Sequence, residues 1–174
     1  MMKWQDHYWY TVPCMRRRIE EMVRLAQGAK TILDAGCNDG FLSQALIEAG
    51  FEVTSVDINQ EALDKAFAQF GIAGIKADIC CLPFPENQFD LAIGGEVLEH
   101  LDNPGQGLTE LFRVSKGRVM ISLPIGAYWL GEEGHRWQID AEDIEHDMGA
   151  LDLLEKKLLV MEFKKRGWDG QKIP

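Results

Sequence analysis

The chain has 174 residues, of which 46% are hydrophobic and 26% are charged, a composition that fits a folded globular protein and excludes a disordered one. A formal net charge of -10 disfavours DNA and RNA as substrates, because a large phosphate-contacting surface needs clustered lysines and arginines.

Neither the cysteines nor the N-terminal sequence indicates a metal site or a membrane segment. The four cysteines lack metal-ligand spacing, and the adjacent pair Cys80 and Cys81 has no second pair to complete a zinc site. We therefore expect reduced, structural thiols and no metal. The first residues lack an apolar signal core, and no stretch approaches the ~18 apolar residues of a membrane helix. We expect a cytoplasmic protein without a membrane span.

The chain begins with an aromatic segment and a helix. Residues 1–12 contain Trp4, Tyr8, Trp9 and Tyr10. Two interpretations remain open for this segment, a terminal arm pinned to the domain surface and a lid over a substrate. Pro13 then suits a first helical turn, and apolar residues at helical spacing predict an amphipathic helix that stops at Gly28. Arg16, Arg17 and Arg18 are interpreted as a solvated face of this helix.

Residues 31–42 predict a strand, a tight glycine turn and the start of a helix. Ile32 and Leu33 read as the buried end of the strand, and the turn covers residues 34–40. Such a junction presents backbone N–H groups and the positive end of a helix dipole to a crevice, as in a nucleotide site. Asn38 stands where a dinucleotide fingerprint has its middle glycine, and a P-loop would be longer and followed by Lys-Ser or Lys-Thr.

The same alternation of strand and helix continues. An apolar helix runs from Phe41 to Gly50, and residues 52–56 predict a strand that ends in Asp57. Asp57 lies twenty-one positions after Gly36, close to the spacing at which a carboxylate meets ribose hydroxyls. Asn59 can cap the next helix, which Gly71 closes.

Three more strands are predicted, over residues 74–77, 89–93 and 118–123, with a helix opened by Asn103 and Pro104 before the last of them. This alternation predicts an α/β fold, a doubly wound and mostly parallel sheet with helices on both faces. Ligands of such sheets bind at the carboxyl ends of the strands. Four acidic residues are expected at those ends, Asp34, Asp57, Asp78 and Glu96.

The pattern changes after Pro124. Residues 125–138 predict a long, glycine-bordered loop that carries Tyr128, Trp129, His135 and Trp137. A short helix over residues 140–149 and a last strand over residues 157–164 are expected beyond it.

The glycine turn after Asp34, the acids at the strand ends and the segments 98–101 and 121–124 together resemble class I S-adenosylmethionine-dependent methyltransferases. The likeness is to the small-molecule, ubiquinone-biosynthesis-like (methyltransferase type 11) group, and it spans about residues 30–124. It implies a Rossmann-like sheet, S-adenosylmethionine as cofactor and S-adenosylhomocysteine as product. We expect one domain over residues 1–174, with an arm and leading helix (1–28), a cofactor-binding core (30–124) and substrate-side elements (125–174).

The resemblance also implies roles for individual residues. The turn residues Gly36, Cys37, Asn38 and Gly40 would cradle the methionine part, with Asp34 near its ammonium group. Asp57 would hold the ribose, Ile58 would pack on adenine, and Asp78 and Ile79 would meet the adenine amino group and ring nitrogen. Glu96 is the fourth strand-end acid assigned to the site.

Three features depart from the family pattern. Asn38 replaces a glycine that is common in the turn, and residues 114–117 lack a frequent proline-glycine pair. The family usually closes its sheet with an antiparallel hairpin, and only one clear strand is predicted here beyond residue 125. We therefore expect an abbreviated hairpin.

The expected reaction is in-line transfer of a methyl group to an oxygen or nitrogen of a small molecule, with His135 as candidate base. The alternative is a methyltransferase-like binding or scaffold protein without activity. A nicotinamide-dependent dehydrogenase is disfavoured by the missing third glycine.

An apolar acceptor pocket is expected where the N-terminal segment and the 125–138 loop meet. The candidate contacts are Tyr8, Tyr10, His100, Tyr128, Trp129 and Trp137. The open alternative is that the rings cover a surface left by a missing strand. Glu99 and His100 are interpreted either as a proton-transfer pair or as a polar helix start.

Overall fold

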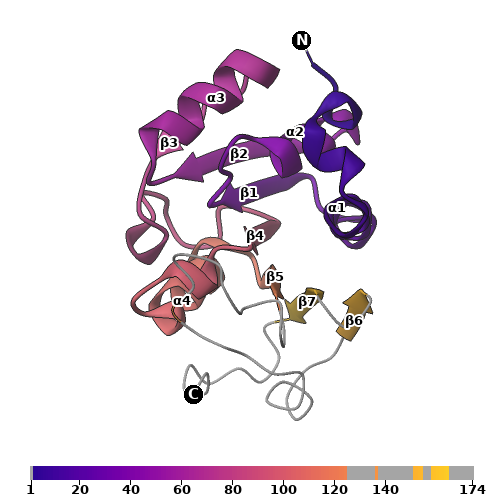
Figure 1. The fold of residues 1–174 in the computed structure, drawn as a ribbon. Helices are drawn as coiled ribbons and strands as arrows, with labels where there is room; N and C mark the ends of the chain where they lie inside the picture. The colour runs from indigo at the N-terminus through magenta and orange to yellow at the C-terminus, as the bar shows by residue number, and fades with distance from the viewer. Residues whose placement is uncertain (1, 125–135, 137–150, 155–157, 165–174) are drawn as a thin grey trace.

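The computed structural model describes residues 2–124, 136, 151–154 and 158–164 (Figure 1). These residues contain a seven-stranded sheet of order β3-β2-β1-β4-β5-β7-β6. Its strands are β1 (Thr31–Ala35), β2 (Glu52–Asp57), β3 (Ile75–Lys76), β4 (Leu91–Gly95), β5 (Arg118–Pro124), β6 (Leu151–Leu154) and β7 (Leu158–Lys164). The first five run parallel, and β7 runs antiparallel to both β5 and β6. The predicted doubly wound α/β sheet is confirmed.

The helices begin and end where local signals predict. They are α1 (Pro13–Leu25), α2 (Phe41–Glu48), α3 (Gln60–Phe70) and α4 (Pro104–Val114), with short 3₁₀ turns η1 (Trp4–Asp6), η2 (Tyr8–Thr11), η3 (Ile79–Cys81) and η4 (Leu98–His100). The Asn59 side chain accepts from the Glu61 N–H at 2.9 Å and caps α3. Gly71 ends this helix with a positive φ of 74°.

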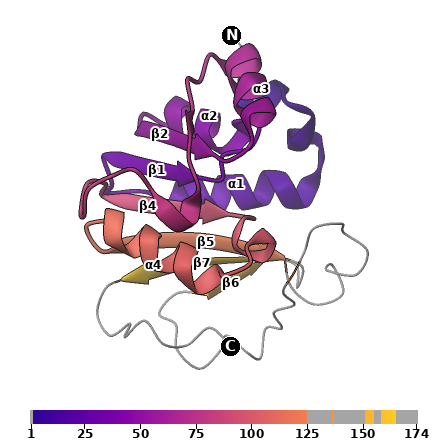
Figure 2. The ribbon, with the colours of Figure 1, turned by 90° about the vertical axis from the view of Figure 1, so that its left-hand side faces the viewer.

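The helices cover both faces of the sheet, and α1 and α4 lie on opposite sides of the strands (Figures 1 and 2). Neighbouring residues of β1 point to opposite faces, as the pleat of a strand requires. Ile32 packs in a buried cluster with Met22 of α1 and Phe41 of α2. Leu33 packs in the other cluster, which includes Leu111 of α4. Each cluster combines buried strand residues with buried helix residues, so a hydrophobic layer lies on each face of the sheet.

The order of the strands reverses between β1 and β4, which pair in parallel although two strands separate them in sequence. Such a switch point leaves a crevice at the carboxyl ends of the two strands, because their following segments run to opposite faces. The glycine turn after β1 and the segment 96–100 after β4 flank it.

The C-terminal hairpin that was expected to be abbreviated has both strands, and its outer strand β6 is short, with four residues. β7 pairs with β5 at seven positions, from Arg118 opposite Lys164 to Pro124 opposite Leu158. β6 pairs with β7 at four positions. The β6 sequence is short and contains no β-branched residue, so it gave no strand signal of its own. The helix expected over residues 140–149 lies outside the described residues.

Among the helices of the described residues, none combines the length and the apolar character needed to cross a membrane.

Candidate cofactor site

The turn between β1 and α2 is fixed by backbone hydrogen bonds to the neighbouring strand. The N–H groups of Gly36 and Cys37 both donate to the Val56 carbonyl at 2.9 Å. Gly36 has a φ of 81°, and a Cβ on it would lie 2.6 Å from Val97 Cγ2, so a glycine is required here. Gly40, with a φ of 85°, forms the N-cap of α2. The turn therefore brings the start of α2 to the crevice, as predicted.

Asp57 joins the turn to the start of α3. Its Oδ2 accepts from the Asn38 N–H and its Oδ1 from the Asn59 N–H, each at 2.8 Å. Asn38 itself has a φ of 48°, a left-handed conformation that asparagine tolerates better than most residues. The departure from glycine at this position is therefore accommodated by the fold. The Asp57 carboxylate stays partly exposed at the carboxyl end of β2.

The next predicted contacts lie along the same edge of the sheet. The Ile58 side chain is 64% exposed, so its apolar surface is open to a ligand. Asp78 follows β3, is exposed and accepts from the Cys80 N–H at 2.8 Å. Ile79 is only 6% exposed and its side chain belongs to the core, so a contact from it would come from its backbone.

Asp34 lies beneath the turn and is 1% exposed. The Ser43 hydroxyl donates to its Oδ2 at 2.6 Å and lies 2.7 Å from the Ser55 hydroxyl. Burial raises the pKa of Asp34 to about 6, and the Ser43 hydrogen bond opposes the shift. Asp34 thus ties α2 to β1 and β2, and the structure places it beneath the crevice floor.

A second group of charged residues collects at the ends of β4 and β5. It consists of Arg18 from α1, Glu96 after β4 and Glu99 in η4, and we call it the strand-end cluster. Arg18 Nη1 donates to the Ser122 hydroxyl at 3.3 Å, and Ser122 also hydrogen-bonds to Glu96. Within the described part of the chain, four buried atoms of the cluster have no hydrogen-bond partner: Arg18 Nε, Glu96 Oε1 and both Glu99 carboxylate oxygens.

The carboxyl groups of the cluster are shifted toward their protonated forms. Burial, reinforced by the neighbouring Glu96 charge, raises the pKa of Glu99 to about 8. Burial likewise raises the pKa of Glu96, opposed by the Arg18 charge and the Ser122 hydrogen bond. Two carboxyl groups beside one arginine can hold a proton near neutral pH and release or accept it during a reaction.

Sequence reasoning missed Arg18, and it left Glu99 open between a proton-transfer pair with His100 and a polar helix start. The solvated-face interpretation is wrong for Arg18, although Arg17 is exposed. Arg18 precedes the fully buried Met22 by four residues, which places both on one face of α1 and was the available signal. Glu99 is 1% exposed in η4, so the helix-start interpretation located the element and missed the burial of the side chain.

The structure does not bring the predicted acceptor contacts together within the described residues. Tyr8 is 58% exposed, and the Tyr10 ring packs edge-on against Trp4 at 5.0 Å. His100 lies exposed at the end of η4. The remaining candidates lie outside the described residues: Tyr128, Trp129, Trp137 and the candidate base His135.

Arg136 is the one residue of the segment 125–138 that the structure describes. Its backbone N–H donates to the Glu99 carbonyl at 2.8 Å, and its guanidinium group pairs with Asp102. These contacts place Arg136 beside η4.

Cysteine or metal chemistry finds no support in the described residues. None of the four cysteines forms a disulfide, and burial raises the pKa of Cys37 in the turn, which makes its thiol unreactive. The part of the chain that the structure describes contains no group of three or more histidine, cysteine, aspartate or glutamate side chains placed to hold a metal ion.

Comparison with known proteins agrees with this geometry. Residues 33–121 match the family described as methyltransferase domain, and the chain belongs to that family. The class I S-adenosylmethionine-dependent methyltransferase resemblance is thereby confirmed.

Curated relatives match the core of the chain. A ubiquinone biosynthesis O-methyltransferase from Bordetella avium is 33% identical over 92 residues, which cover 49% of this chain and 38% of that protein. A malonyl-[acyl-carrier protein] O-methyltransferase from Erwinia billingiae is 36% identical over 115 residues, 64% of this chain and 45% of that protein. The chain thus spans less than half the length of these relatives.

Solved structures share the fold. Magnesium protoporphyrin IX methyltransferase from Synechocystis PCC 6803, solved with bound S-adenosylhomocysteine, has a TM-score of 0.72 at 18% identity, with 87% of this chain and 83% of that one covered. A protein from Pyrococcus horikoshii OT3 has a TM-score of 0.70 at 19% identity, with 86% and 90% covered. At these identities the likeness concerns the fold alone.

Proposed function

We propose that the chain is an S-adenosylmethionine-dependent methyltransferase that acts on an oxygen or nitrogen of a small-molecule acceptor. The observation that carries this proposal is the edge formed by Asn38, Asp57 and Ile58. A partly exposed carboxylate, held by two N–H groups, lies next to an exposed apolar side chain. The carboxylate suits a ribose diol and the side chain suits a purine face. The cofactor carries a sulfonium and an ammonium group and no phosphate, so an acidic site favours it.

The other residues of the turn complete this assignment. The helix start at Gly40 and the backbone of Gly36, Cys37 and Asn38 would hold the methionine part. Asp78, one strand further along the edge, would meet the adenine amino group. Asp34 would act from beneath the turn by fixing α2, since Ser43 occupies its Oδ2.

The strand-end cluster provides the acceptor side of the proposed site. When bound, S-adenosylmethionine supplies the methyl group, whose bond to sulfur breaks as the acceptor atom attacks in line. Glu99 and Glu96 can accept hydrogen bonds from an acceptor O–H or N–H, because three of their oxygens have no partner among the residues that the structure describes. The raised pKa of Glu99 lets its carboxylate take the acceptor proton near neutral pH. His135 remains the candidate base from the sequence.

The names of the relatives favour an oxygen acceptor, since the Bordetella and Erwinia proteins are both O-methyltransferases. We propose a small molecule rather than a nucleic acid, because the net charge of -10 opposes a polyanion. The domain organisation expected from the sequence, one methyltransferase domain over residues 1–174, belongs to the same proposal. The features that suggested a scaffold protein have other accounts: the hairpin forms, and Asn38 fits the turn.

A transfer assay tests this function. The chain is incubated with methyl-labelled S-adenosylmethionine and a panel of small phenols, alcohols and amines. We expect label on an oxygen or nitrogen acceptor, with one S-adenosylhomocysteine formed for each methyl group transferred. Binding of S-adenosylhomocysteine without transfer to any acceptor, including those in a metabolite extract, would favour the scaffold alternative.

A further inference from the structure

The N-terminal arm, which we define as residues 2–12, is bound to the elements that carry the glycine turn. The Met2 N–H donates to the Gln69 carbonyl at 3.2 Å, near the end of α3. The Trp4 N–H donates to Glu48 Oε1 at 3.0 Å, at the end of α2. The Trp4 ring lies 5.6 Å from the Phe41 ring at the start of α2. These contacts agree with the pinned-arm interpretation of the sequence.

His7 is the most buried residue of the arm, with 3% of its surface exposed. Its ring stacks on Phe41 with 5.0 Å between centroids and 25° between planes. Its Nδ1 accepts from the Trp9 N–H at 3.2 Å, so the hydrogen-bond pattern assigns the ring proton to Nε2. Nε2 lies 3.2 Å from Asp39 Oδ2, which places this N–H opposite a carboxylate of the glycine turn.

Asp39 lies in the part of the turn where the backbone conformation is most restricted. It lies between Asn38 and Gly40, which both have positive φ and whose N–H groups bind Asp57 and the Cys37 carbonyl. The side chain of Asp39 is 15% exposed and points to the arm. A hydrogen bond to this side chain therefore restrains the backbone segment that directs the turn toward the crevice.

We propose that His7 is a positioning residue for the cofactor, acting through Asp39 to hold the glycine turn in its binding conformation. This inference rests on the proposed function, since it takes the turn to be the S-adenosylmethionine site. The arm then belongs to the cofactor side of the site and does not act as an acceptor lid. A turn without this restraint loses conformational entropy when the ligand binds. The hydrogen bond from His7 orders the turn before binding, so the ligand pays less of that entropy.

Calorimetric titration with S-adenosylhomocysteine tests the inference on the full chain. We expect His7→Ala to weaken binding about tenfold, because a hydrogen bond to a charged partner is lost. His7→Gln keeps an N–H that reaches Asp39 and should bind within about threefold of the unaltered chain. Trp4→Leu is the matched control: it removes arm packing on Phe41 and should lower the melting temperature while leaving the affinity unchanged.

A second variant keeps the test decisive if His7→Ala fails to fold. Asp39→Asn weakens the same contact from the other side, and adding His7→Phe to it, which removes the N–H and keeps a ring on Phe41, should cause no further loss of affinity. Additive losses in the double variant, or an unchanged affinity in a folded His7→Ala chain, would overturn the inference. Absence of binding by the unaltered chain would overturn the proposed function itself, and the inference with it.

Discussion

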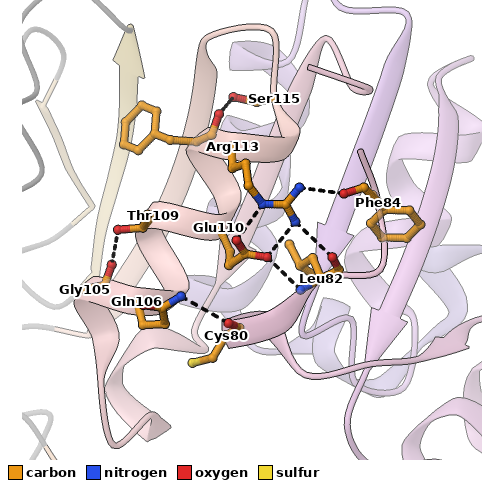
Figure 3. Close-up of polar contacts among 10 residues, drawn as sticks. Cys80, Leu82, Phe84, Gly105, Gln106, Thr109, Glu110, Arg113 and Ser115 are labelled. Atoms are coloured by element: carbon orange, nitrogen blue, oxygen red, sulfur yellow. Dashed lines mark hydrogen bonds and ion pairs between the residues drawn. The ribbon is translucent and has the colours of Figure 1, made fainter. Parts of the chain in front are cut away.

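Two groups of acidic residues and an arginine in this molecule have a similar composition, but they differ in whether their buried polar atoms have hydrogen-bond partners. The first joins α4 to the loop after η3 (Figure 3). Arg113 donates from Nε and Nη2 to the two Glu110 oxygens at 2.6 and 2.7 Å. It also donates to the carbonyls of Leu82 and Phe84, and Glu110 accepts from the Leu82 N–H. Every charged group here has a protein partner.

The strand-end cluster differs in that four of its buried polar atoms have no partner among the described residues. Leaving a buried polar group unsatisfied costs about 1–3 kcal/mol. A fold tolerates that cost where a ligand supplies the missing partners. From this contrast we propose that the Glu110–Arg113 pair stabilises the fold and that the strand-end cluster takes part in the reaction.

The largest expected effect is on catalysis. Glu99→Gln keeps the shape of the side chain and removes the group that takes the proton. We expect methyl transfer to fall about 100-fold or more, since general bases contribute ~10²–10⁴ in rate. The measurement is the rate of S-adenosylhomocysteine formation with a hydroxyl acceptor found in the transfer assay.

Glu110→Gln is the matched control for Glu99→Gln, because both replace a carboxyl group on an acid–arginine pair. Its turnover should remain within about twofold of the unaltered rate while its stability falls, as expected for a charged hydrogen bond lost outside the site. Equal losses of turnover in both variants would remove the distinction between the two groups.

Arg113→Ala should give the largest loss of stability. It leaves Glu110 without its cation and frees the carbonyls of Leu82 and Phe84. We expect the free energy of unfolding to fall by about 3 kcal/mol, with affinity for S-adenosylhomocysteine unchanged. Urea denaturation checks this prediction. Arg113→Lys keeps the charge and loses the planar guanidinium group, so its free energy of unfolding should lie between those of the unaltered chain and Arg113→Ala. A loss below the error of the measurement would show that the Arg113 contacts do not stabilise the loop after η3.

The sequence predicted the regular parts of this molecule because each rests on a local signal. Ile32 and Leu33 mark a buried strand by composition, and Asn59 and Gly71 mark the ends of α3 by their capping chemistry. Asp57 could be assigned to the site by its spacing from Gly36 alone. These residues lie where strand order and glycine geometry determine the position of a side chain.

The strand-end cluster and the His7 contact could not be predicted in the same way. Arg18, Glu96 and Glu99 come from three elements, and their shared burial depends on how α1 packs on β4 and β5. His7 meets Asp39 across thirty-two positions of sequence only because the arm folds back on α2. The helical spacing of Arg18 and Met22 indicates which face of α1 Arg18 shares, but no periodicity or motif indicates the partners on other elements, since those contacts arise from tertiary packing.

Asp57→Ala should weaken cofactor binding less than Glu99→Gln slows catalysis. The substitution removes a hydrogen-bond acceptor for the ribose and the restraint on Asn38. We expect a loss of about 1–3 kcal/mol in the binding free energy of S-adenosylhomocysteine, measured by calorimetry. Asp57→Asn keeps one acceptor oxygen and should lose less. Unaltered affinity in Asp57→Ala would remove this residue from the site.

The remaining prediction concerns the pH dependence of stability. The folded-state pKa of Glu99 is about 8, above its ordinary value of 4.5, so folding favours the protonated form. Its contribution to stability is therefore complete below pH 4.5 and is lost as the pH rises through 8. Relative to Glu99→Gln, the unaltered chain should lose about 1 kcal/mol or more of unfolding free energy between pH 5 and pH 8. Parallel stability curves for the two proteins over this range would contradict the raised pKa.

The most direct test of the central claim is calorimetric titration of the unaltered chain with S-adenosylhomocysteine. The crevice at the carboxyl ends of β1, β2 and β3 predicts a single site per chain. Binding should raise the melting temperature and should not be displaced by a nicotinamide dinucleotide, because Asn38 occupies the place of the glycine that a pyrophosphate needs. A folded chain that shows neither heat of binding nor a thermal shift with S-adenosylhomocysteine or S-adenosylmethionine would contradict the account.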